Sequence, residues 1–361
     1  MTRILVVNAG SSSLKLRLLG DDDAVLRTAD LGSDRSELAA AIEGWPEPRA
    51  VGHRVVHGGV RFTGPAVIDA DVRREIADLA DLAPLHQPKS LAALDEVTAV
   101  FPDVPAVACF DTAFHHTIPA AAATYALPVQ WRERWPLQRY GFHGLSVAYC
   151  ARRVAELVPG ARRLVVCHLG AGASVTALAD GRSVDTTMGF TPLEGLVMAT
   201  RSGTVDPGLV LWLEEHAKLR PNQVATALEQ ESGLLGLAGD ADIRTVLVRA
   251  AAGDDTARLA IDVYVHRLAA SIAAMATAAR GVDVLVFTGG VGERADEIRA
   301  AAVEALDFLG IGLDAAANSA ASPDAEVTAR GSPARVFVIA AREDLQIAAE
   351  SRTALSEAST T

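Results

Sequence analysis

The chain has 361 residues, which at roughly one domain per ~150 residues predicts two domains and leaves room for a large buried core. Hydrophobic residues make up 50% and charged residues 22%, a composition that excludes a mainly disordered, collagenous or fibrous protein. The formal net charge of −12 argues against a nucleic-acid partner or an anionic membrane surface.

The cysteine pattern and the apolar runs indicate where the protein works. Cys109, Cys150 and Cys167 are far apart in apolar segments, which is typical of neither a disulfide framework nor a metal motif. No uninterrupted apolar run reaches the ~18 residues of a membrane span, and the chain opens directly into a strand pattern rather than a signal peptide. We therefore expect a reduced, soluble, cytoplasmic protein without a membrane partner.

The first third of the chain predicts a mixed α/β unit. A β-branched apolar run, a Gly/Ser turn and an alternating run predict a strand that turns and returns over residues 3–19. Further strands are expected at 50–59, which runs into a glycine turn, and at 104–110, which ends at Asp111. Helices are expected at 71–82 and 88–100, because the prolines between them forbid one continuous helix.

The middle of the chain repeats the opening pattern. Residues 161–184 show an apolar strand, a Gly/Ser turn and a returning strand, and Asp180-Gly181 adds a second hairpin. This recurrence predicts two similar halves. Residues 206–280 are helix-rich, with a long Ala-rich helix over 254–280. Core strands are expected at 282–287 and 334–340, and a last helix from about Asp344.

Three glycine- or serine-rich turns follow apolar strands. They are NAGSSS at 8–13, HLGAGAS at 168–174 and TGGVGE at 288–293. Backbone N–H groups in such turns can cradle phosphate oxygens, although a single glycine turn more often serves chain geometry alone. None of the three matches a P-loop or a dinucleotide-binding fingerprint. Together they favour a phosphate-containing ligand held in another way.

The order and spacing of several segments resemble the acetate kinase family. They are NAGSSSLK (8–15), GHRVVHGG (52–59), APLHQP (83–88), FDTAFHHTIP (110–119), YGFHG (140–144), HLGAGAS (168–174), MGFTPLEGLVMATRSGTVDPG (188–208), TGGVGE (288–293) and REDLQIA (342–348). The resemblance covers essentially the whole chain. It implies an α/β fold of two similar actin-like, ribonuclease H-like domains with an active-site cleft between them. The implied boundaries are 1–114 plus the returning 345–361 for one domain, and 115–344 for the other.

The resemblance implies phosphoryl transfer between ATP and acetate, giving acetyl phosphate and ADP. Carboxylic acids titrate near ~4, so an acetate acceptor is already ionised at neutral pH and needs no general base. The difficulty is to bring two anions together, because phosphoryl transfer relies on positioning and on charge neutralisation. Arginine forks suit the oxygens of a carboxylate or a phosphoryl group.

Four residues are implied to be catalytic. Arg54 and Arg201 should bracket the acceptor carboxylate and the transferring phosphoryl group, and His143 should donate a hydrogen bond to that group. Asp111 ends a buried strand, where an idle carboxylate would be costly, so we expect it to hold an arginine or a metal-bound water. A phosphorylated intermediate on Asp111 or Glu343 is the alternative to direct in-line attack.

The implied acceptor pocket is small and apolar. Its wall would consist of Val56, Leu85, Phe142 and Pro192, with His86 in support and Arg54 at its polar end. Ordinary core packing is the other interpretation of these apolar residues. Enzymes acting on propionate tend to have a smaller residue at the position of Val56. One methylene discriminates by only about 1 to 3 kcal/mol, so propionate should be a poorer substrate rather than an excluded one.

The resemblance also implies the nucleotide and metal positions. Nucleotide contacts are expected at Lys15, His168, Leu169, Gly170, Ala171, Gly172, Asp242, Ile243, Arg244, Gly289, Gly290, Val291, Gly292 and Glu293. Asn8 and Glu343 should lie at a Mg²⁺ ion, with Mn²⁺ as a substitute, because Mg²⁺ needs few protein carboxylates beside substrate phosphates.

The chain departs from the family pattern at several places. Ala171 stands where Asn is usual, and Arg342 stands where Asn or Asp is usual. The segment after Arg244 lacks a frequent acidic residue, and the segment between Gly20 and Gly52 is shorter than in relatives. These departures affect the nucleotide and metal assignments more than the acceptor assignments.

Two other functions stay open at this point. One is a kinase for propionate or another short-chain carboxylate, and the other is an actin-like module that uses ATP to drive partner binding. The resemblance further implies a homodimer.

Overall fold

A computed structural model of the chain describes residues 3–10, 14–32, 38–83 and 87–358. The chain divides into two compact units. Unit 1 consists of Met1–His116, Phe142–Tyr149 and Arg342–Thr361, and unit 2 consists of Thr117–Gly141 and Cys150–Ala341. Helix α6 (Gly144–Leu157) begins in unit 1 and ends in unit 2. The domain boundaries expected from the sequence stay a prediction.

The sheet of unit 1 carries an antiparallel meander beside parallel strands. Its strands are β1 (Ile4–Ala9), β2 (Leu14–Leu19), β3 (Val25–Leu31), β4 (Ala50–Val55), β5 (Ala66–Val67) and β6 (Ala106–Phe110). Their order across the described sheet is β3-β2-β1-β4-β6-β5. Strands β1, β4 and β6 run parallel, whereas β2, β3 and β5 pair antiparallel with their neighbours. The carboxyl ends of β1, β4 and β6 therefore meet at one edge.

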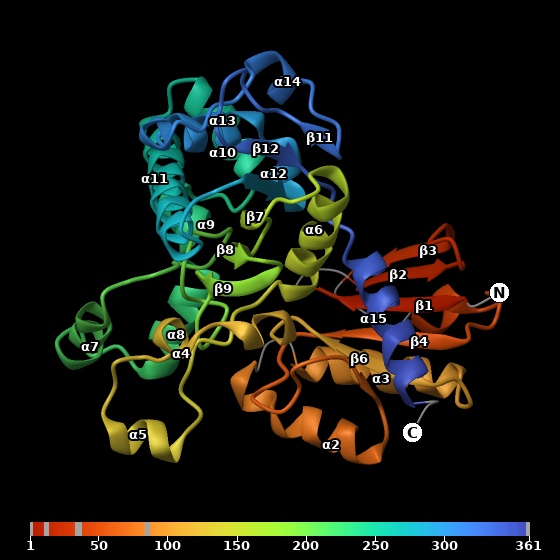
Figure 1. Cartoon of the computed structure of the whole chain (residues 1–361). Helices are drawn as coiled ribbons and strands as arrows, with labels where there is room; N and C mark the ends of the chain where they lie inside the picture. The colour runs from red at the N-terminus through yellow and green to blue at the C-terminus, as the bar shows by residue number, and fades with distance from the viewer. Residues whose placement is uncertain (1–2, 11–13, 33–37, 84–86, 359–361) are drawn as a thin grey trace. The chain divides into compact units, whose positions relative to one another are not determined.

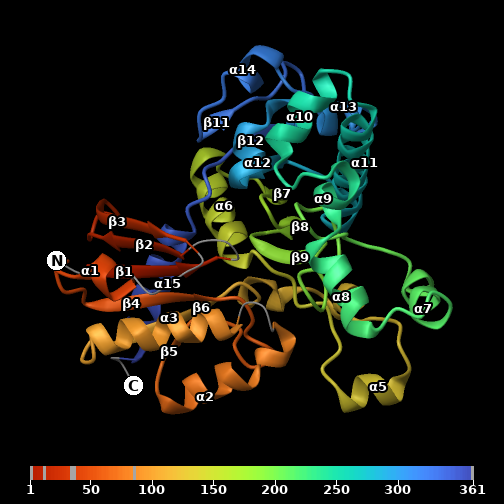
Figure 2. The same cartoon turned by 180° about the vertical axis from the view of Figure 1, so that it is seen from behind.

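Helices cover both faces of this sheet. They are α1 (Leu38–Ile42), α2 (Ala70–Asp78), α3 (Gln87–Val100) and α15 (Glu343–Ala358), with short 3₁₀ turns at Ala80–Leu82 and Ala113–Thr117. Leu5 and Val7 of β1 pack toward α3, while Ile4 and Val6 pack toward α15. A strand buried on both faces has a continuous run of apolar residues, so β1 could be predicted from the sequence. Figure 1 shows α15 before the sheet, and Figure 2 shows α3 on its other side.

The sheet of unit 2 repeats this topology. Its strands are β7 (Arg163–Leu169), β8 (Ala173–Ala179), β9 (Arg182–Thr186), β10 (Val284–Thr288), β11 (Ala325–Glu326) and β12 (Arg335–Val338). The order β11-β12-β10-β7-β8-β9, taken from the other end, matches that of unit 1 strand for strand, including every parallel and antiparallel pairing. The predicted duplication is confirmed.

Unit 2 is richer in helices than unit 1. They are α4 (Ala120–Ala123), α5 (Val129–Arg134), α7 (Pro207–Glu215), α8 (Pro221–Gln230), α9 (Gly233–Ala238), α10 (Ile243–Ala251), α11 (Asp255–Ala278), α12 (Gly289–Arg294), α13 (Asp296–Glu304) and α14 (Ala315–Ser319), with a 3₁₀ turn at Asp307–Leu309. Among the described residues, only α11 is long and apolar enough to cross a membrane by length and composition. It packs against β7, β8, α9, α10 and α13, the position of a core helix.

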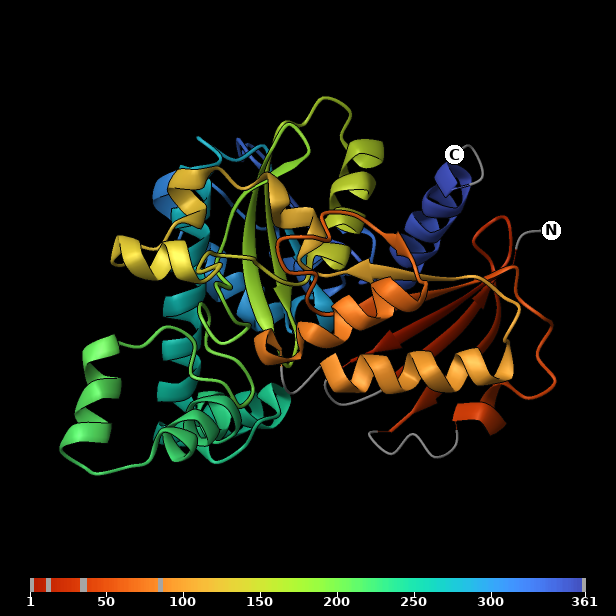
Figure 3. The same cartoon turned by 90° about the horizontal axis from the view of Figure 1, so that it is seen from below.

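The largest difference from the predicted elements is strand β3. Its side chains are mostly exposed, and it lies at the sheet edge beside β2. Only Ala29 and Leu31 of β3 are partly buried against the core, so the segment carries little of the apolar pattern that marks a strand in the sequence. The next described element along the chain is the short helix α1. Figure 3 shows α2 and α3 side by side, separate helices as predicted.

Candidate active site

The strand ends of unit 1 carry a linked set of charged side chains. Arg54 on β4 binds Asp111 directly after β6: its Nη2 lies 2.6 Å from Oδ2, and its Nε lies 3.2 and 3.1 Å from the two carboxylate oxygens. The Arg54 Nη1 also donates to Oδ1 of Asn8 at 3.2 Å, and Asn8 Nδ2 donates to Oε2 of Glu343 at 2.6 Å. Parallel pairing of β1, β4 and β6 brings the first three residues together, and the start of α15 brings Glu343.

Burial sets the electrostatics of this cluster, because Arg54 and Asp111 have side-chain exposures of only 13% and 1%. Burial and the nearby charge of Glu343 raise the pKa of Asp111 above its ordinary value, against the opposing effect of Arg54. Burial lowers the pKa of Arg54, but the negative charges of Asp111 and Glu343 raise it by more. The net effect is a raised pKa, so Arg54 stays a cation. The expectation that Asp111 holds an arginine agrees with this geometry.

His143 is held in a rare backbone conformation. Its φ is +59°, in the left-handed region that non-glycine residues seldom adopt. Nε2 of His115 lies 2.9 Å from the carbonyl oxygen of Phe142, and the N–H of Gly144 donates to the carbonyl oxygen of Asp111 at 2.9 Å. A Cβ on Gly144 would lie 2.2 Å from that same oxygen, so only glycine fits there. Strain of this kind persists where surrounding contacts fix it, commonly at functional sites.

The expected acceptor residues of unit 1 are apolar and buried. Val56 follows β4 with 4% exposure, and Phe142 has 1% exposure. The ring of His57 meets Phe142 edge-on at a centroid distance of 5.6 Å. Leu85 and His86 lie outside the described residues. Pro192, the remaining expected wall residue, belongs to unit 2.

Asn8 and Glu343 offer the donor set that Mg²⁺ prefers. Both supply hard oxygen atoms, and Mg²⁺ commonly takes one or two protein ligands with water and phosphate as the rest. Within the described ranges no group of three His, Cys, Asp or Glu side chains is arranged to hold a metal by itself. Asn8 and Glu343 therefore fit an ion that takes its remaining ligands from water and phosphate.

Arg201 of unit 2 lies in a loop pinned to α9. Backbone N–H groups of Ser232, Leu234 and Leu235 donate to carbonyls of the segment 198–200. Gly233 has a φ of +63°, and a Cβ there would lie 2.2 Å from the Met198 carbonyl oxygen. The loop and the first turn of α9 thus fix the main chain around Arg201.

The guanidinium of Arg201 makes its described hydrogen bonds with uncharged groups. Its Nη1 donates to the carbonyl oxygen of Pro192 at 3.0 Å and approaches the sulfur of Met198 at 3.7 Å. No carboxylate in the described part of the chain forms an ion pair with it. Burial lowers its pKa, with only partial compensation from Glu229. A half-buried cation that forms no ion pair within the described ranges is suited to bind an anion.

Two of the expected nucleotide turns meet at one sheet edge in unit 2. Strands β7 and β10 pair in parallel with His168 beside Thr288, so the turns after them are neighbours. Gly289 has a φ of +80°, and a Cβ there would lie 2.7 Å from the carbonyl oxygen of Leu169. The Gly289–Glu293 segment forms the start of α12, and the loop after Leu169 carries Gly170 to Gly172.

The other expected nucleotide residues lie at separate places. Asp242 caps α10 by accepting from the N–H of Arg244, and the two side chains pair with each other at the surface. Lys15 lies on β2 of unit 1, in register with Asn8. Within unit 2, no printed contact joins Asp242 or Arg244 to the two glycine turns.

Comparison with known proteins identifies the family of the chain. The sequence matches the acetokinase family over residues 36–349. The chain belongs to the acetokinase family. A protein named acetate kinase from Nostoc punctiforme is 46% identical over 311 residues, covering 85% of this chain and 76% of that protein.

Solved structures of acetokinases share the fold. A propionate kinase from Francisella tularensis has a TM-score of 0.90 at 35% identity, covering 97% of this chain and 99% of that one. Acetate kinase from Porphyromonas gingivalis has a TM-score of 0.89 at 32% identity, covering 98% and 100%. These neighbours confirm the expected fold class, a mixed α/β protein with two similar actin-like halves.

Two departures from the acetokinase pattern are Ala171 and Arg342, and nothing in the structure explains the first. Ala171 contributes its main chain, since its carbonyl oxygen accepts from the N–H of Ala199. Arg342 pairs with Asp344, with two contacts of 2.9 Å, and this ion pair raises its pKa. The positive charge next to Glu343 is thus compensated locally.

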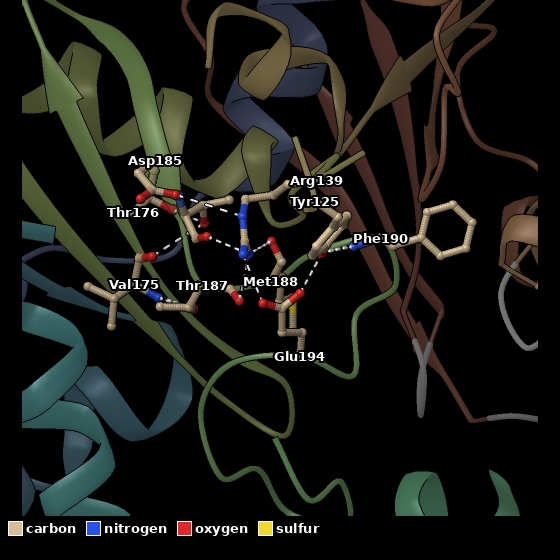
Figure 4. Close-up of polar contacts among 10 residues, drawn as sticks. Tyr125, Arg139, Val175, Thr176, Asp185, Thr187, Met188, Phe190 and Glu194 are labelled. Carbon is tan, nitrogen blue, oxygen red and sulfur yellow. Dashed lines mark hydrogen bonds and ion pairs between the residues drawn. The ribbon is translucent and has the colours of Figure 1, made fainter. Parts of the chain in front are cut away.

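Sequence analysis did not single out one polar cluster of this acetokinase. Arg139, Glu194 and Tyr125 form a half-buried network in unit 2, shown in Figure 4. Arg139 directly precedes the YGFHG segment, and Glu194 lies within MGFTPLEG, so both stand inside or beside segments that carry the resemblance. Their position in or next to these segments is the feature of the sequence that could have indicated the cluster.

Proposed function

We propose that the protein is an acetate kinase: it transfers the γ-phosphoryl group of ATP to acetate, reversibly, giving acetyl phosphate and ADP. The observation that carries the proposal is the 46% identity over 311 residues to a protein named acetate kinase. The side-chain arrangement supports it, because both units hold an arginine suited to oxyanions at the positions that the family resemblance marks.

The proposed step is direct in-line attack. An acetate oxygen forms a bond to the γ-phosphorus while the bond from that phosphorus to the bridging oxygen breaks, and ADP leaves with the electron pair. Arg54 binds the acceptor carboxylate, Arg201 neutralises the phosphoryl oxygens, and His143 donates a hydrogen bond to them. Asp111 orients Arg54 through the two-pronged contact. No proton has to be removed from the acceptor.

We further propose that Asn8 and Glu343 hold Mg²⁺ on the nucleotide phosphates. The ion neutralises phosphate charge when it is bound. Lys15 and the residues 168–172, 242–244 and 289–293 are proposed to contact the nucleotide. Titration of activity with Mg²⁺ and Mn²⁺ in wild type and Glu343→Gln tests this: we expect a raised metal requirement in the variant, and an unchanged requirement contradicts the assignment.

A hydroxamate assay tests the activity itself. Hydroxylamine traps an acyl phosphate as a coloured hydroxamate, and we expect the product to depend on both ATP and acetate. ATP turnover that ignores acetate would contradict the proposal and favour an actin-like ATP-driven binding module. With chiral γ-phosphate, in-line attack inverts the configuration at phosphorus, while a phosphorylated Asp111 or Glu343 intermediate would retain it.

Propionate kinase is the second candidate, favoured by the Francisella structure at a TM-score of 0.90. Steady-state kinetics with acetate, propionate and butyrate separates the two. We expect kcat/KM to be highest for acetate, because Val56 and Phe142 are bulky, buried residues at the expected wall positions. A higher value for propionate would transfer the assignment to the second candidate.

We also propose a homodimer in the cytoplasm. Unit 2 exposes large apolar side chains on α5 and α7, among them Trp131 at 52%, Leu211 at 55% and Trp212 at 54%. Large apolar side chains exposed together mark an interface more often than single exposed ones do. Light scattering should give twice the mass of one chain for the wild type and a weaker dimer for Leu211→Asp. Val248→Asp, at a 71% exposed position on α10, is the matched control and should stay dimeric.

A further inference from the structure

The Arg139 network secures the loop that begins where β9 ends. Nη1 of Arg139 donates to three consecutive carbonyl oxygens, those of Thr186, Thr187 and Met188, at 3.0, 3.2 and 3.1 Å. Nη2 of Arg139 donates to Oε1 of Glu194 at 2.8 Å. One guanidinium therefore binds both the start of the loop and a side chain six residues beyond it (Figure 4).

Tyr125 joins the same loop from a second side. Its hydroxyl donates to Oε2 of Glu194 at 2.5 Å and accepts from the N–H of Phe190 at 2.9 Å. Burial and the neighbouring carboxylate of Glu194 raise the pKa of Tyr125 to about 12, so the hydroxyl keeps its proton at neutral pH. Both oxygens of Glu194 are thus engaged, one by each partner.

Gly189 shows how closely the network and the loop fit. A Cβ at Gly189 would lie 1.8 Å from Oε2 of Glu194 and 2.1 Å from the hydroxyl oxygen of Tyr125. The carbonyl oxygen of Gly189 also accepts from the N–H groups of Tyr140 and Gly141. Any side chain here would separate the groups of the network.

The loop held by Arg139 and Tyr125 contains Pro192, whose carbonyl oxygen is the hydrogen-bond acceptor of Arg201. Pro192 lies between Phe190, held by Tyr125, and Glu194, held by Arg139, and its carbonyl oxygen accepts from Nη1 of Arg201 at 3.0 Å. No carboxylate of the described chain positions Arg201, so this carbonyl is its main polar anchor. The network therefore acts on the shorter of the two described contacts of the guanidinium, the other being the contact with the Met198 sulfur.

We propose that Arg139, Glu194 and Tyr125 are positioning residues that set the direction of the Arg201 guanidinium by fixing the Pro192 carbonyl. The inference rests on the proposed role of Arg201 in phosphoryl transfer. A displacement of about 1 Å in a group that orients a reacting centre can cost roughly 100-fold in rate. Loss of the network should therefore lower kcat while the KM for ATP stays nearly unchanged.

Conservative variants test the proposal without removing bulk. Arg139→Lys, Glu194→Gln and Gly189→Ala should each lower kcat by roughly 10- to 100-fold, and Tyr125→Phe by less. Gly189→Ala leaves every charged group in place, so a loss in this variant reports geometry rather than charge. The combined Tyr125→Phe/Glu194→Gln variant should be no worse than Glu194→Gln, because both act through one carboxylate.

Arg249→Lys is the matched control. Arg249 also pairs with a carboxylate of unit 2, that of Asp254 at 2.7 and 2.9 Å, and also donates to a carbonyl oxygen, that of Ala238 at 2.7 Å. Arg249 lies in the last turn of α10, and none of its printed contacts is to the loop that carries Pro192. Its kcat should stay within twofold of wild type. An equal loss in the control would mean that any ion pair of unit 2 matters, and would overturn the proposal.

The decisive experiment repeats these substitutions in an Arg201→Ala background. If the network acts through Arg201, Glu194→Gln should change kcat by less than twofold there. An equal loss in both backgrounds overturns the inference while leaving the role of Arg201 intact. A wild-type kcat in Arg201→Ala alone contradicts the proposed role of Arg201 and removes the basis of the inference with it. A change confined to the KM for ATP also overturns the inference.

Discussion

Arg54 and Arg201, the two arginines proposed to bind oxyanions, are held in different ways. In unit 1, the Arg54 guanidinium is held by a buried carboxylate, that of Asp111, and by the amide oxygen of Asn8. In unit 2, Arg201 is held by a carbonyl oxygen and carries no counter-charge among the described residues. In the first arrangement, the carboxylate of Asp111 fixes the position of the Arg54 guanidinium and compensates much of its charge. In the second, the Arg201 guanidinium keeps its charge but is held by a weaker hydrogen bond to a carbonyl oxygen.

The difference suggests a division of work. An acceptor carboxylate carries one negative charge, and a compensated but rigid guanidinium suffices to orient it. A transferring phosphoryl group spreads more charge over three oxygens, for which an uncompensated cation is the better partner. The predictions below test this contrast, beginning with the largest expected effect.

Removing either arginine should slow turnover strongly but affect stability unequally. We expect Arg54→Ala and Arg201→Ala each to lower kcat by roughly 10³-fold with ATP binding nearly unchanged. Arg54→Ala leaves the buried Asp111 carboxylate unpaired and should also cost about 3 kcal/mol of stability. Arg201→Ala leaves no charge unpaired and should cost under about 1 kcal/mol. Kinetics and urea unfolding measure both; equal stability losses would contradict the contrast.

Asp111→Asn should have the next largest effect. The amide keeps the size of the side chain but cannot accept both contacts from Arg54 as a charged partner. We expect kcat/KM for acetate to fall by roughly 10- to 100-fold, since Arg54 loses orientation but not charge. A loss as large as that of Arg54→Ala would favour a direct chemical role for Asp111 over an orienting one.

Val56→Ala tests the acceptor pocket and should change selectivity more than rate. Val56 is buried after β4, and loss of two methyl groups makes room for the longer chain of propionate. The ratio of kcat/KM for propionate to that for acetate should rise by roughly 10-fold, within the range that one methylene supplies. An unchanged ratio in competition kinetics would remove Val56 from the pocket wall.

Acid should destabilise unit 1 before unit 2. Burial lowers the pKa of His53, His57 and His115 to about 4, so these rings are neutral in the folded protein. The unfolded chain binds protons near pH ~6.5, so stability falls as the pH drops from about 6.5 to 4. In unit 2, an arginine partner lowers the pKa of Asp283 to about 2, and its contribution is lost only as the pH falls from about 4 toward 2.

The tryptophans make this pH difference measurable. Trp45 lies in unit 1, while the other tryptophans, Trp131, Trp135 and Trp212, are exposed residues of unit 2. In a variant with those three replaced by Phe, urea unfolding followed by Trp45 fluorescence should show a lower midpoint at pH 5 than at pH 7. An unchanged midpoint would mean that the three histidines titrate alike in the folded and unfolded chain.

Periodicity and the family resemblance together predicted most of the fold. Strands such as β1 are buried on both faces and therefore appear as apolar runs, and the duplicated sheets follow from the repeated strand-turn-strand pattern. The sequence did not reveal β3, because a mostly exposed edge strand with only Ala29 and Leu31 partly buried shows little apolar alternation. Pairing partners, rather than its own composition, make it a strand.

Candidate site residues could be predicted where they stand in a sequence motif. Contacts that depend only on how the chain folds could not be predicted. Arg54 and Asp111 stand in marked segments, and the structure joins them through adjacent parallel strands. The left-handed φ of His143 could not be read from its type, since histidine usually adopts negative φ. The link from Arg139 to Glu194 spans fifty-five positions and depends on how the loop after β9 folds back.

One contact made by Asp111 belongs to its main chain. Its carbonyl oxygen accepts from the N–H of Gly144, beside His143, while its carboxylate holds Arg54. Alanine scanning at this position would report only the carboxylate, since every amino acid carries the same carbonyl. Replacing the amide N–H of Gly144 by an ester oxygen through chemical ligation would probe the second tether alone. A complete set of side-chain mutants would leave that tether unexamined.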